Sequence, residues 1–171
     1  IDTSDVKALE AGLKAYPGRA LINSVSAEPD RLKYFIPLAK RYGAAILCLP
    51  LSDEGIPKTA KERLTLAQKI IAEAKAQGLK DNDFLLDALV MTIAADKNAC
   101  NEVLNTLKLY REHIGAPSTM GLSNISFGLP NRPLINSTFF TMCLAMGLNA
   151  PIMNPYDDSM QNALSASNAL L

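Results

Sequence analysis

The sequence predicts an α/β protein, specifically part of a (β/α)8 barrel. Short apolar runs that read as strands alternate with helical patterns in the order βαβαβαβαβ. These strands are continuous apolar runs, which is typical of a parallel sheet buried on both faces. No GxGxxG or GxxxxGK[ST] motif follows any strand. The fingerprints of the nucleotide-binding open sheets are therefore missing, and the barrel is the favoured interpretation.

Each expected helix has apolar residues at helical spacing and a residue that stops it. Residues 28–43 place Leu32, Phe35, Ile36 and Ala39 on one face and end at Gly43. The next helix has the stripe Leu64, Ala67, Ile70, Ile71 and Ala74 and closes at Gly78. The expected helices are 5–16, 28–43, 59–78, 98–115, 132–147 and the tail 156–171; the expected strands are 1–3 (its end only), 20–26, 44–51, 83–93, 117–126 and 149–155.

The number of strands indicates an incomplete barrel. Five strands and the end of a sixth are present in 171 residues, whereas an eight-stranded barrel takes about 250 residues. We therefore expect one domain over residues 1–171, running from the end of barrel strand 3 to the start of helix 8. The first two units and most of the third are expected to be absent.

The composition excludes several classes of partner. Apolar residues make up 49% of the chain, and 17 basic residues balance 17 acidic ones. There is no basic surplus to attract nucleic acid or an anionic membrane surface. The longest apolar runs are too short to span a bilayer, and the first residues lack the pattern of a signal peptide. The sequence predicts a cytoplasmic protein with neither a nucleic-acid nor a membrane partner.

Cysteine and histidine offer little catalytic chemistry. Cys48, Cys100 and Cys143 form no CxxC pair, and they are expected to be buried small hydrophobic residues. His113 is the only histidine, so neither a Cys/His zinc site nor a Ser-His-Asp triad is predicted. It is expected near a helix C-terminus, where a cationic imidazole suits the helix dipole. No metal site is expected.

Small hydrogen-bonding residues recur where the expected strands end. In a barrel these ends converge on one mouth, which carries the binding and catalytic groups. Carboxylates and carboxamides around one cavity suit a neutral heterocycle rich in hydrogen-bonding groups. The alternative for each residue is capping or local loop hydrogen bonding. The strand-end residues are Asp2-Thr3, Asn23-Ser24, Ser52-Asp53, Asp87, Ser123-Asn124 and Asn154.

Several of these segments resemble a known family. "IDTSDVKALEAGLK", "ALINSVSAEPDRL", "DEGIPKTAKERLTLA", "LLDALV" and "GLSNISFGLPNRPLINSTFF" are similar to the pterin-binding domain of methyltetrahydrofolate:corrinoid methyltransferases. That family includes the folate domain of cobalamin-dependent methionine synthase. The resemblance implies a (β/α)8 barrel, usually a homodimer, that transfers the N5-methyl group of methyltetrahydrofolate to a cob(I)alamin or corrinoid. The corrinoid is carried by a partner protein or domain.

The resemblance also implies roles for individual residues. Asp2, Asn23 and Asp87 match family positions that bind the pterin, and Asn124 matches the asparagine of the "LSN" motif. Asn124 is predicted to donate a hydrogen bond to the departing N5 as charge develops there. Ser123 and Asn154, which also stand at these strand ends, are predicted to bind substrate. Ala88 replaces the usual family proline after Asp87, and a DxN-like motif of the family's earlier strands is absent from this chain.

Two features of the sequence leave alternatives open. Residues 127–132 are expected to form a mobile lip, in which Asn131 and Arg132 either contact ligand at the rim or cap the helix begun by Pro133. The activity itself has two rivals. One is a non-catalytic pterin-binding fragment. The other is dihydropteroate synthase, which is disfavoured because its Gly-Phe-Gly-Lys-type loop and Arg-x-His motif are both missing.

Overall fold

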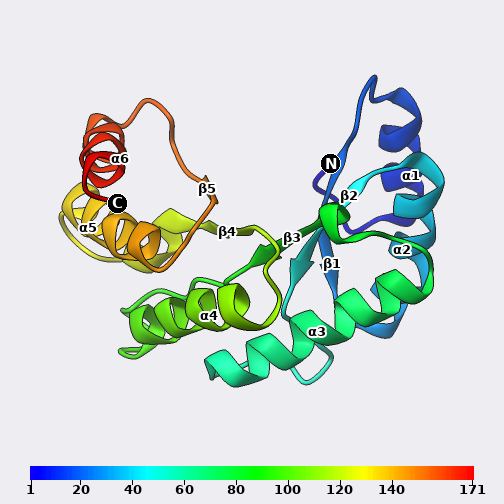
Figure 1. Ribbon diagram of the computed structural model, residues 1–171, viewed down its shortest axis with the longest axis horizontal. Coiled ribbons are helices and arrows are strands. Elements are labelled where there is room, and N and C mark those ends of the chain that lie inside the picture. The colour runs from blue at the N-terminus through cyan, green and yellow to red at the C-terminus, as the bar shows by residue number, and fades with distance from the viewer. The chain divides into compact units, whose positions relative to one another are not determined.

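A computed structural model describes all 171 residues of the chain (Figure 1). The internal contacts divide it into two compact units, unit 1 (Ile1–Asp87) and unit 2 (Ala88–Leu171). Each unit contains parallel strands joined by helices. The α/β class with alternating strands and helices, predicted from the sequence, is confirmed.

Unit 1 is a parallel sheet of three strands with three helices. Strand β1 pairs with β2 in the register Ile22↔Ile46, and β2 pairs with β3 in the register Cys48↔Leu86. The expected strand end at residues 1–3 is present as a parallel bridge between Asp2 and Asn23. The elements are α1 (Val6–Ala15), β1 (Leu21–Ser26), α2 (Pro29–Tyr42), β2 (Ala45–Leu49), α3 (Ala60–Ala76), the 3₁₀ turn η1 (Asp81–Asp83) and β3 (Phe84–Asp87).

The helices of unit 1 begin and end where local side chains satisfy the backbone. The Asp5 carboxylate accepts from the Ala8 N–H at 2.7 Å and starts α1. Thr59 and Glu62 form a reciprocal capping box at the start of α3. Gly43 ends α2 in the left-handed conformation, with φ of 65°, which a residue without a side chain adopts at low cost.

Unit 2 has two parallel strands and three helices. Strands β4 and β5 pair in the register Thr119↔Ala150 to Gly121↔Ile152. His113 is the last residue of α4 and is exposed, as expected for a residue at a helix C-terminus. The elements are α4 (Ala99–His113), β4 (Ser118–Gly121), the 3₁₀ turn η2 (Leu122–Ser126), α5 (Arg132–Ala145), β5 (Ala150–Ile152) and α6 (Asp158–Leu170).

Each unit packs an apolar core between its strands and helices. In unit 1 the helix stripes predicted from the sequence are buried, except that Leu64 is only half-buried and Arg63 is buried instead. In unit 2 the side chains of Phe139 and Phe140 from α5 join Leu122 and Ile125 from η2 in one cluster. The core of unit 2 therefore anchors the turn that carries the "LSN" motif.

The strands are shorter than the apolar runs that predicted them. The run 83–93 forms a strand only over Phe84–Asp87, and Leu89 adopts a positive φ of 55° soon afterwards. The run 117–126 forms β4 and then turns into η2. Strand β1 ends at Ser26, where the expected strand 20–26 also ends, and it has a register irregularity between Ile22 and Val25. Asn23 therefore lies within a strand, rather than at its end as predicted.

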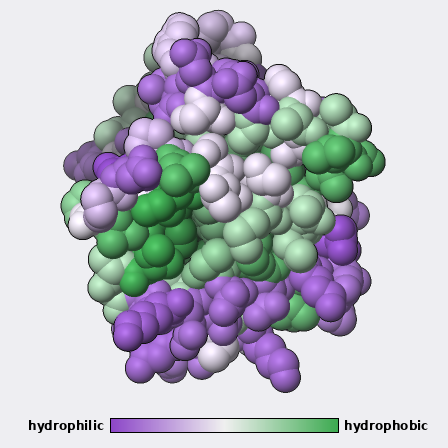
Figure 2. All heavy atoms as spheres, turned by 90° about the vertical axis from the view of Figure 1, so that its left-hand side faces the viewer, coloured by the Kyte–Doolittle hydropathy of each residue, from purple (hydrophilic) through white to green (hydrophobic).

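Large exposed apolar side chains are concentrated in unit 2. Figure 2 shows apolar side chains, in green, gathered across the middle of the face it views, between hydrophilic side chains above and below. Phe127 is 67% exposed and Tyr156 is 90% exposed. None of the helices combines the length and the apolar composition that a membrane span requires.

The three cysteines differ in burial, which makes their reactivity a test of the core. Cys48 and Cys143 are buried, and Cys100 is half-buried. Burial raises the pKa of the Cys48 thiol to about 12 and also raises the pKa of Cys143 and Cys100.

We expect the thiol reagent DTNB at pH 8 to react first with Cys100, and with Cys48 and Cys143 only after unfolding. Because an unfolded cysteine ionises near pH 8.5, the unfolded state loses its thiol protons before the folded state does. The free energy of unfolding should therefore be independent of these thiols below about pH 8 and fall as the pH rises above that value. A native protein that titrates all its thiols at one fast rate would contradict the burial.

Candidate functional site

In unit 1 the structure brings Asp2 and Asn23 together. They form the parallel bridge described above, and the Asn23 N–H donates to the Ile1 carbonyl at 2.9 Å. The Asn23 carboxamide also donates to an Asp2 carboxylate oxygen over a long 3.4 Å. Asp2 is exposed and Asn23 is half-buried, so both side chains can reach a ligand.

Asp2 and Asn23 line a small pocket of about 170 Å³. The pocket combines hydrogen-bonding side chains with two leucines, which suits a flat polar heterocycle. One wall is ordered by Ser26, whose buried hydroxyl donates to the Glu28 carboxylate at 2.6 Å. The full lining is Asp2, Thr3, Ser4, Asn23, Ser24, Ser26, Glu28, Arg31, Leu49 and Leu51.

Asp87 is the last residue of β3 and does not line this pocket. It directly follows Leu86, which pairs with Cys48 of β2, and Cys48 in turn pairs with Val25 of β1. Asp87 therefore lies at the carboxyl edge of the three-stranded sheet, and Asn23 belongs to a strand of the same sheet. Its side chain is half-buried.

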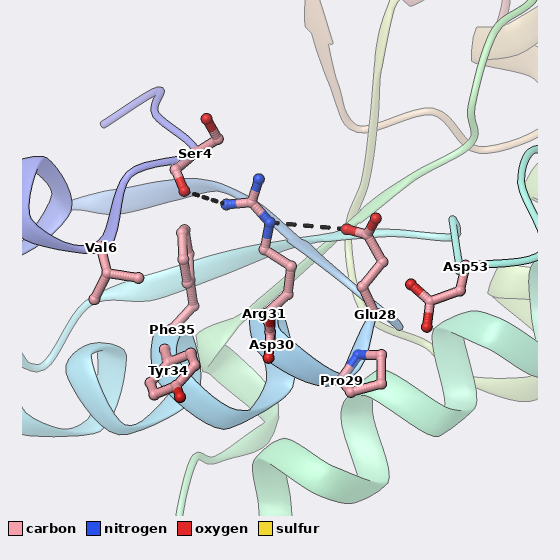
Figure 3. Close-up of a pocket in the computed structure, with 9 residues that line it drawn as sticks. All are labelled: Ser4, Val6, Glu28, Pro29, Asp30, Arg31, Tyr34, Phe35 and Asp53. Atoms are coloured by element: carbon pink, nitrogen blue, oxygen red, sulfur yellow. Dashed lines mark hydrogen bonds and ion pairs between the residues drawn. The ribbon is translucent and has the colours of Figure 1, made fainter.

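A larger pocket of about 610 Å³ adjoins the small one, since both are lined by Ser4, Glu28 and Arg31. Figure 3 shows the Arg31 guanidinium between Ser4 and Glu28: it donates to the Ser4 carbonyl at 3.2 Å and lies 3.8 Å from the Glu28 carboxylate. The guanidinium also lies over the Phe35 ring, 4.5 Å from the centroid. With Asp30 and Asp53 also lining it, this pocket is net acidic and does not favour a carboxylated ligand.

In unit 2, Ser123 and Asn124 lie in η2, directly after β4. Both residues are exposed, whereas Leu122, Ile125 and Ser126 of the same turn are buried. The Asn124 carbonyl accepts from the Phe127 N–H at 3.1 Å. The buried residues of η2 therefore anchor the turn, and the side chains of Ser123 and Asn124 are exposed.

Asn154 follows β5 at the edge of unit 2 that also carries Asn124, because β4 and β5 are parallel. Its carboxamide oxygen accepts from the Tyr156 N–H at 3.0 Å. This is a local turn contact of the kind that asparagine commonly makes. The oxygen of Asn154 is therefore engaged by the backbone, while its predicted role in substrate binding remains a prediction.

Arg132 is the residue whose contacts the sequence left open. It is the first residue of α5, and its side chain reaches back to the Ser126 hydroxyl and to the Ser123 carbonyl in η2. Asn131 occupies the N-cap position with φ of 52° but makes no side-chain cap bond. Arg132 thus donates hydrogen bonds to the "LSN" turn. The sequence had predicted either a ligand contact at the rim or a helix cap, and this contact is neither of them.

The sequence alone also missed Ser26, Glu28 and Arg31 as parts of the unit 1 pocket walls. The i, i+4 spacing of Arg31 and Phe35 on a helix was a usable signal for their contact. No group of three or more histidine, cysteine, aspartate or glutamate side chains in the chain could hold a metal ion.

Comparisons with known proteins agree with the resemblance seen in the motifs. The profile of the family "Pterin binding enzyme" matches residues 1–154. The chain is 32% identical over 178 residues to a methylcorrinoid:tetrahydrofolate methyltransferase of Eubacterium limosum, covering all of this chain and 64% of that protein. It is 32% identical over 167 residues to the methionine synthase of Mycobacterium tuberculosis, covering 90% of this chain and 14% of that protein. The chain thus spans less than two thirds of the length of either relative.

Among solved structures, the chain is similar to dihydropteroate synthase of Yersinia pestis bound to a pterin–sulfa conjugate. The TM-score is 0.76 with 18% identity, covering 99% of this chain and 66% of that one. At this identity the likeness concerns the fold, and it agrees with the predicted partial (β/α)8 barrel. With the family profile matching nearly the whole sequence, the chain belongs to the family of pterin-binding enzymes.

Proposed function

We propose that this chain binds methyltetrahydrofolate and takes part in methyl transfer between the folate N5 and a corrinoid carried by a partner protein or domain. The observation that carries the proposal is Asn124, which is exposed on a turn whose residues Leu122, Ile125 and Ser126 are buried. Support comes from the names of the two relatives, which describe methyl transfer involving a corrinoid and methionine synthesis. Residues 1–171 are proposed to act as one barrel domain.

The unit 1 residues supply the hydrogen bonds that a pterin requires. A pterin presents an exocyclic amine and a ring N–H as donors, next to a carbonyl acceptor. The carboxylates of Asp2 and Asp87 can accept from the donors, and the carboxamide of Asn23 can both donate and accept. We assign the pterin edge to these three residues. Ser123 and Asn154 are proposed as further substrate contacts.

The group-transfer step needs a donor at N5. The N5–methyl bond breaks with its electron pair left on N5, which takes a proton from solvent. The two electrons of the new cobalt–carbon bond come from cobalt(I). Because negative character develops on N5 during this step, an Asn124 amide N–H aimed at N5 stabilises the transition state more than the ground state. The same contact serves the reverse direction, from methylcorrinoid to tetrahydrofolate.

The direct test uses the protein at its full natural length. Mixing it with methyltetrahydrofolate and cob(I)alamin should convert the cob(I)alamin spectrum to that of methylcobalamin. Calorimetry should show binding of methyltetrahydrofolate to the same preparation. Binding without transfer would support the non-catalytic pterin-binding alternative, and the absence of both would overturn the proposal.

Asp87→Ala is expected to weaken the binding of methyltetrahydrofolate by about 5- to 150-fold. Removing one partner leaves buried ligand donors without an acceptor, at a cost of about 1 to 3 kcal/mol. Asp81→Ala is the matched control, because the Asp81 side chain is 88% exposed on the neighbouring turn η1. Equal dissociation constants for the two variants, measured by calorimetry, would remove Asp87 from the pterin site.

A further inference from the structure

We propose that Arg132 and Gly121 are positioning residues that hold the Asn124 carboxamide in its working orientation. Arg132 does so by fixing the backbone of η2, and Gly121 does so by leaving room beside the carboxamide. The inference rests on the proposed role of Asn124 in methyl transfer. It adds two residues outside the predicted site, neither of which need touch the substrate.

Arg132 joins the start of α5 to both sides of Asn124. Its Nε donates to the Ser126 hydroxyl at 3.0 Å, and a terminal nitrogen donates to the Ser123 carbonyl at 2.9 Å. These two acceptors flank Asn124 in sequence. A planar guanidinium donates in two fixed directions, so one side chain sets the relative position of both acceptors.

The Ser126 hydroxyl makes this connection rigid. The side chain is buried and accepts from Arg132; its nearest acceptor is the Asn136 carboxamide oxygen at 2.7 Å, and the Ser123 carbonyl lies at 3.3 Å as a second acceptor. Asn136 lies one turn beyond Arg132 on α5. The turn η2 is thereby tied to α5 by a chain of three side chains, in addition to the apolar contacts of Leu122 and Ile125. Such a network fixes geometry, since each member has a defined partner.

Gly121 supplies the second constraint. A Cβ built on Gly121 would lie 3.1 Å from Nδ2 of Asn124 and 3.7 Å from its Cγ. The first distance is tighter than an ordinary van der Waals contact, so a side chain at 121 would require the Asn124 carboxamide to shift by a few tenths of an ångström. The φ of Gly121 is −74°, which other residues adopt without strain. Any effect of a side chain at 121 would therefore come from the space next to Asn124 rather than from backbone conformation.

The test is a double-mutant cycle that separates an effect through Asn124 from a general structural one. Arg132→Gln and Gly121→Ala should each slow single-turnover methyl transfer by about tenfold or more, because catalysis depends steeply on the placement of the donor. The dissociation constant for methyltetrahydrofolate should change by less than about twofold. In the Asn124→Ala background, both effects on the rate should disappear.

Two substitutions of the same type serve as controls. Arg41→Gln removes an arginine whose side chain is 67% exposed in unit 1, and Gly18→Ala adds a Cβ at an ordinary 3.5 Å contact. Both should transfer methyl groups at the unaltered rate. Gly121→Ala removes no side-chain hydrogen bond, so it tests the inference even where Arg132→Gln does not fold.

The outcomes separate the inference from the proposed function. Normal transfer by Asn124→Ala would reject the role of Asn124, and with it the inference. A slow Asn124→Ala variant combined with normal rates for Arg132→Gln and Gly121→Ala would leave that role intact and overturn the positioning. Equal rate losses in the presence and absence of Asn124 would also overturn it, since the two residues would then act by another route.

Discussion

Asn124→Ala is expected to slow single-turnover methyl transfer by about 10² to 10³-fold, which is comparable to removing one oxyanion-hole donor. The substitution should lower the rate of methyl transfer strongly and raise the dissociation constant for methyltetrahydrofolate much less. Before transfer begins, N5 of methyltetrahydrofolate is a neutral tertiary amine and a weak acceptor, so the hydrogen bond strengthens only as charge develops. Stopped-flow mixing with cob(I)alamin measures the rate, and calorimetry measures the binding.

Two further variants sharpen this result. Asn124→Asp keeps the shape of the side chain but replaces the N–H donor with an acceptor, so it should be as slow as Asn124→Ala. Asn101→Ala, at an exposed position on α4, should transfer at the unaltered rate. If the Asn124→Ala loss appears wholly in the dissociation constant, Asn124 is a binding residue only.

Phe140→Ala is expected to lower the free energy of unfolding of unit 2 by about 3 to 5 kcal/mol. Phe140 is fully buried in the unit 2 core, where its ring packs in one cluster with Leu122 and Ile125 beneath the "LSN" turn. Its removal costs the transfer free energy of the ring and leaves a cavity. Urea unfolding followed by circular dichroism measures the loss.

Phe127→Ala is the matched control, because the same side chain is 67% exposed there. It should change the free energy of unfolding by no more than about 0.5 kcal/mol. Similar unfolding midpoints for the two variants would contradict the assignment of Phe140 to the core. Retained transfer activity in folded Phe127→Ala would show that the lip residue is not needed for chemistry.

Local sequence signals determined the helices well. The caps Asp5, Thr59 and Gly43 lie within one turn of the helix ends that they stabilise, so their effect depends only on residues nearby in the sequence. Apolar spacing also identified the buried faces, except that Leu64 is only half-buried and Arg63 is buried instead. The polar residues after the strands were likewise visible, because small hydrogen-bonding side chains interrupt continuous apolar runs.

Strand limits were decided by tertiary structure. An apolar run says that a segment is buried, but pairing with a neighbour decides where the strand stops. The run 83–93 therefore yielded only Phe84–Asp87, and the pairing of β1 with β2 is irregular between Ile22 and Val25. Neither outcome is encoded in the run itself.

The sequence by itself determined the α/β class, the order of the elements and the identity of Asp2, Asn23, Asp87 and Asn124 as candidate site residues. Only the tertiary structure showed that Asp2 and Asn23 share a pocket, that Asn154 bonds to its own turn, and that Arg132 reaches back to Ser123 and Ser126. The physical reason is the range of the interactions. Helix periodicity and capping act over three or four residues, whereas a side chain's partner depends on how distant segments pack and on the space that a residue such as Gly121 leaves open.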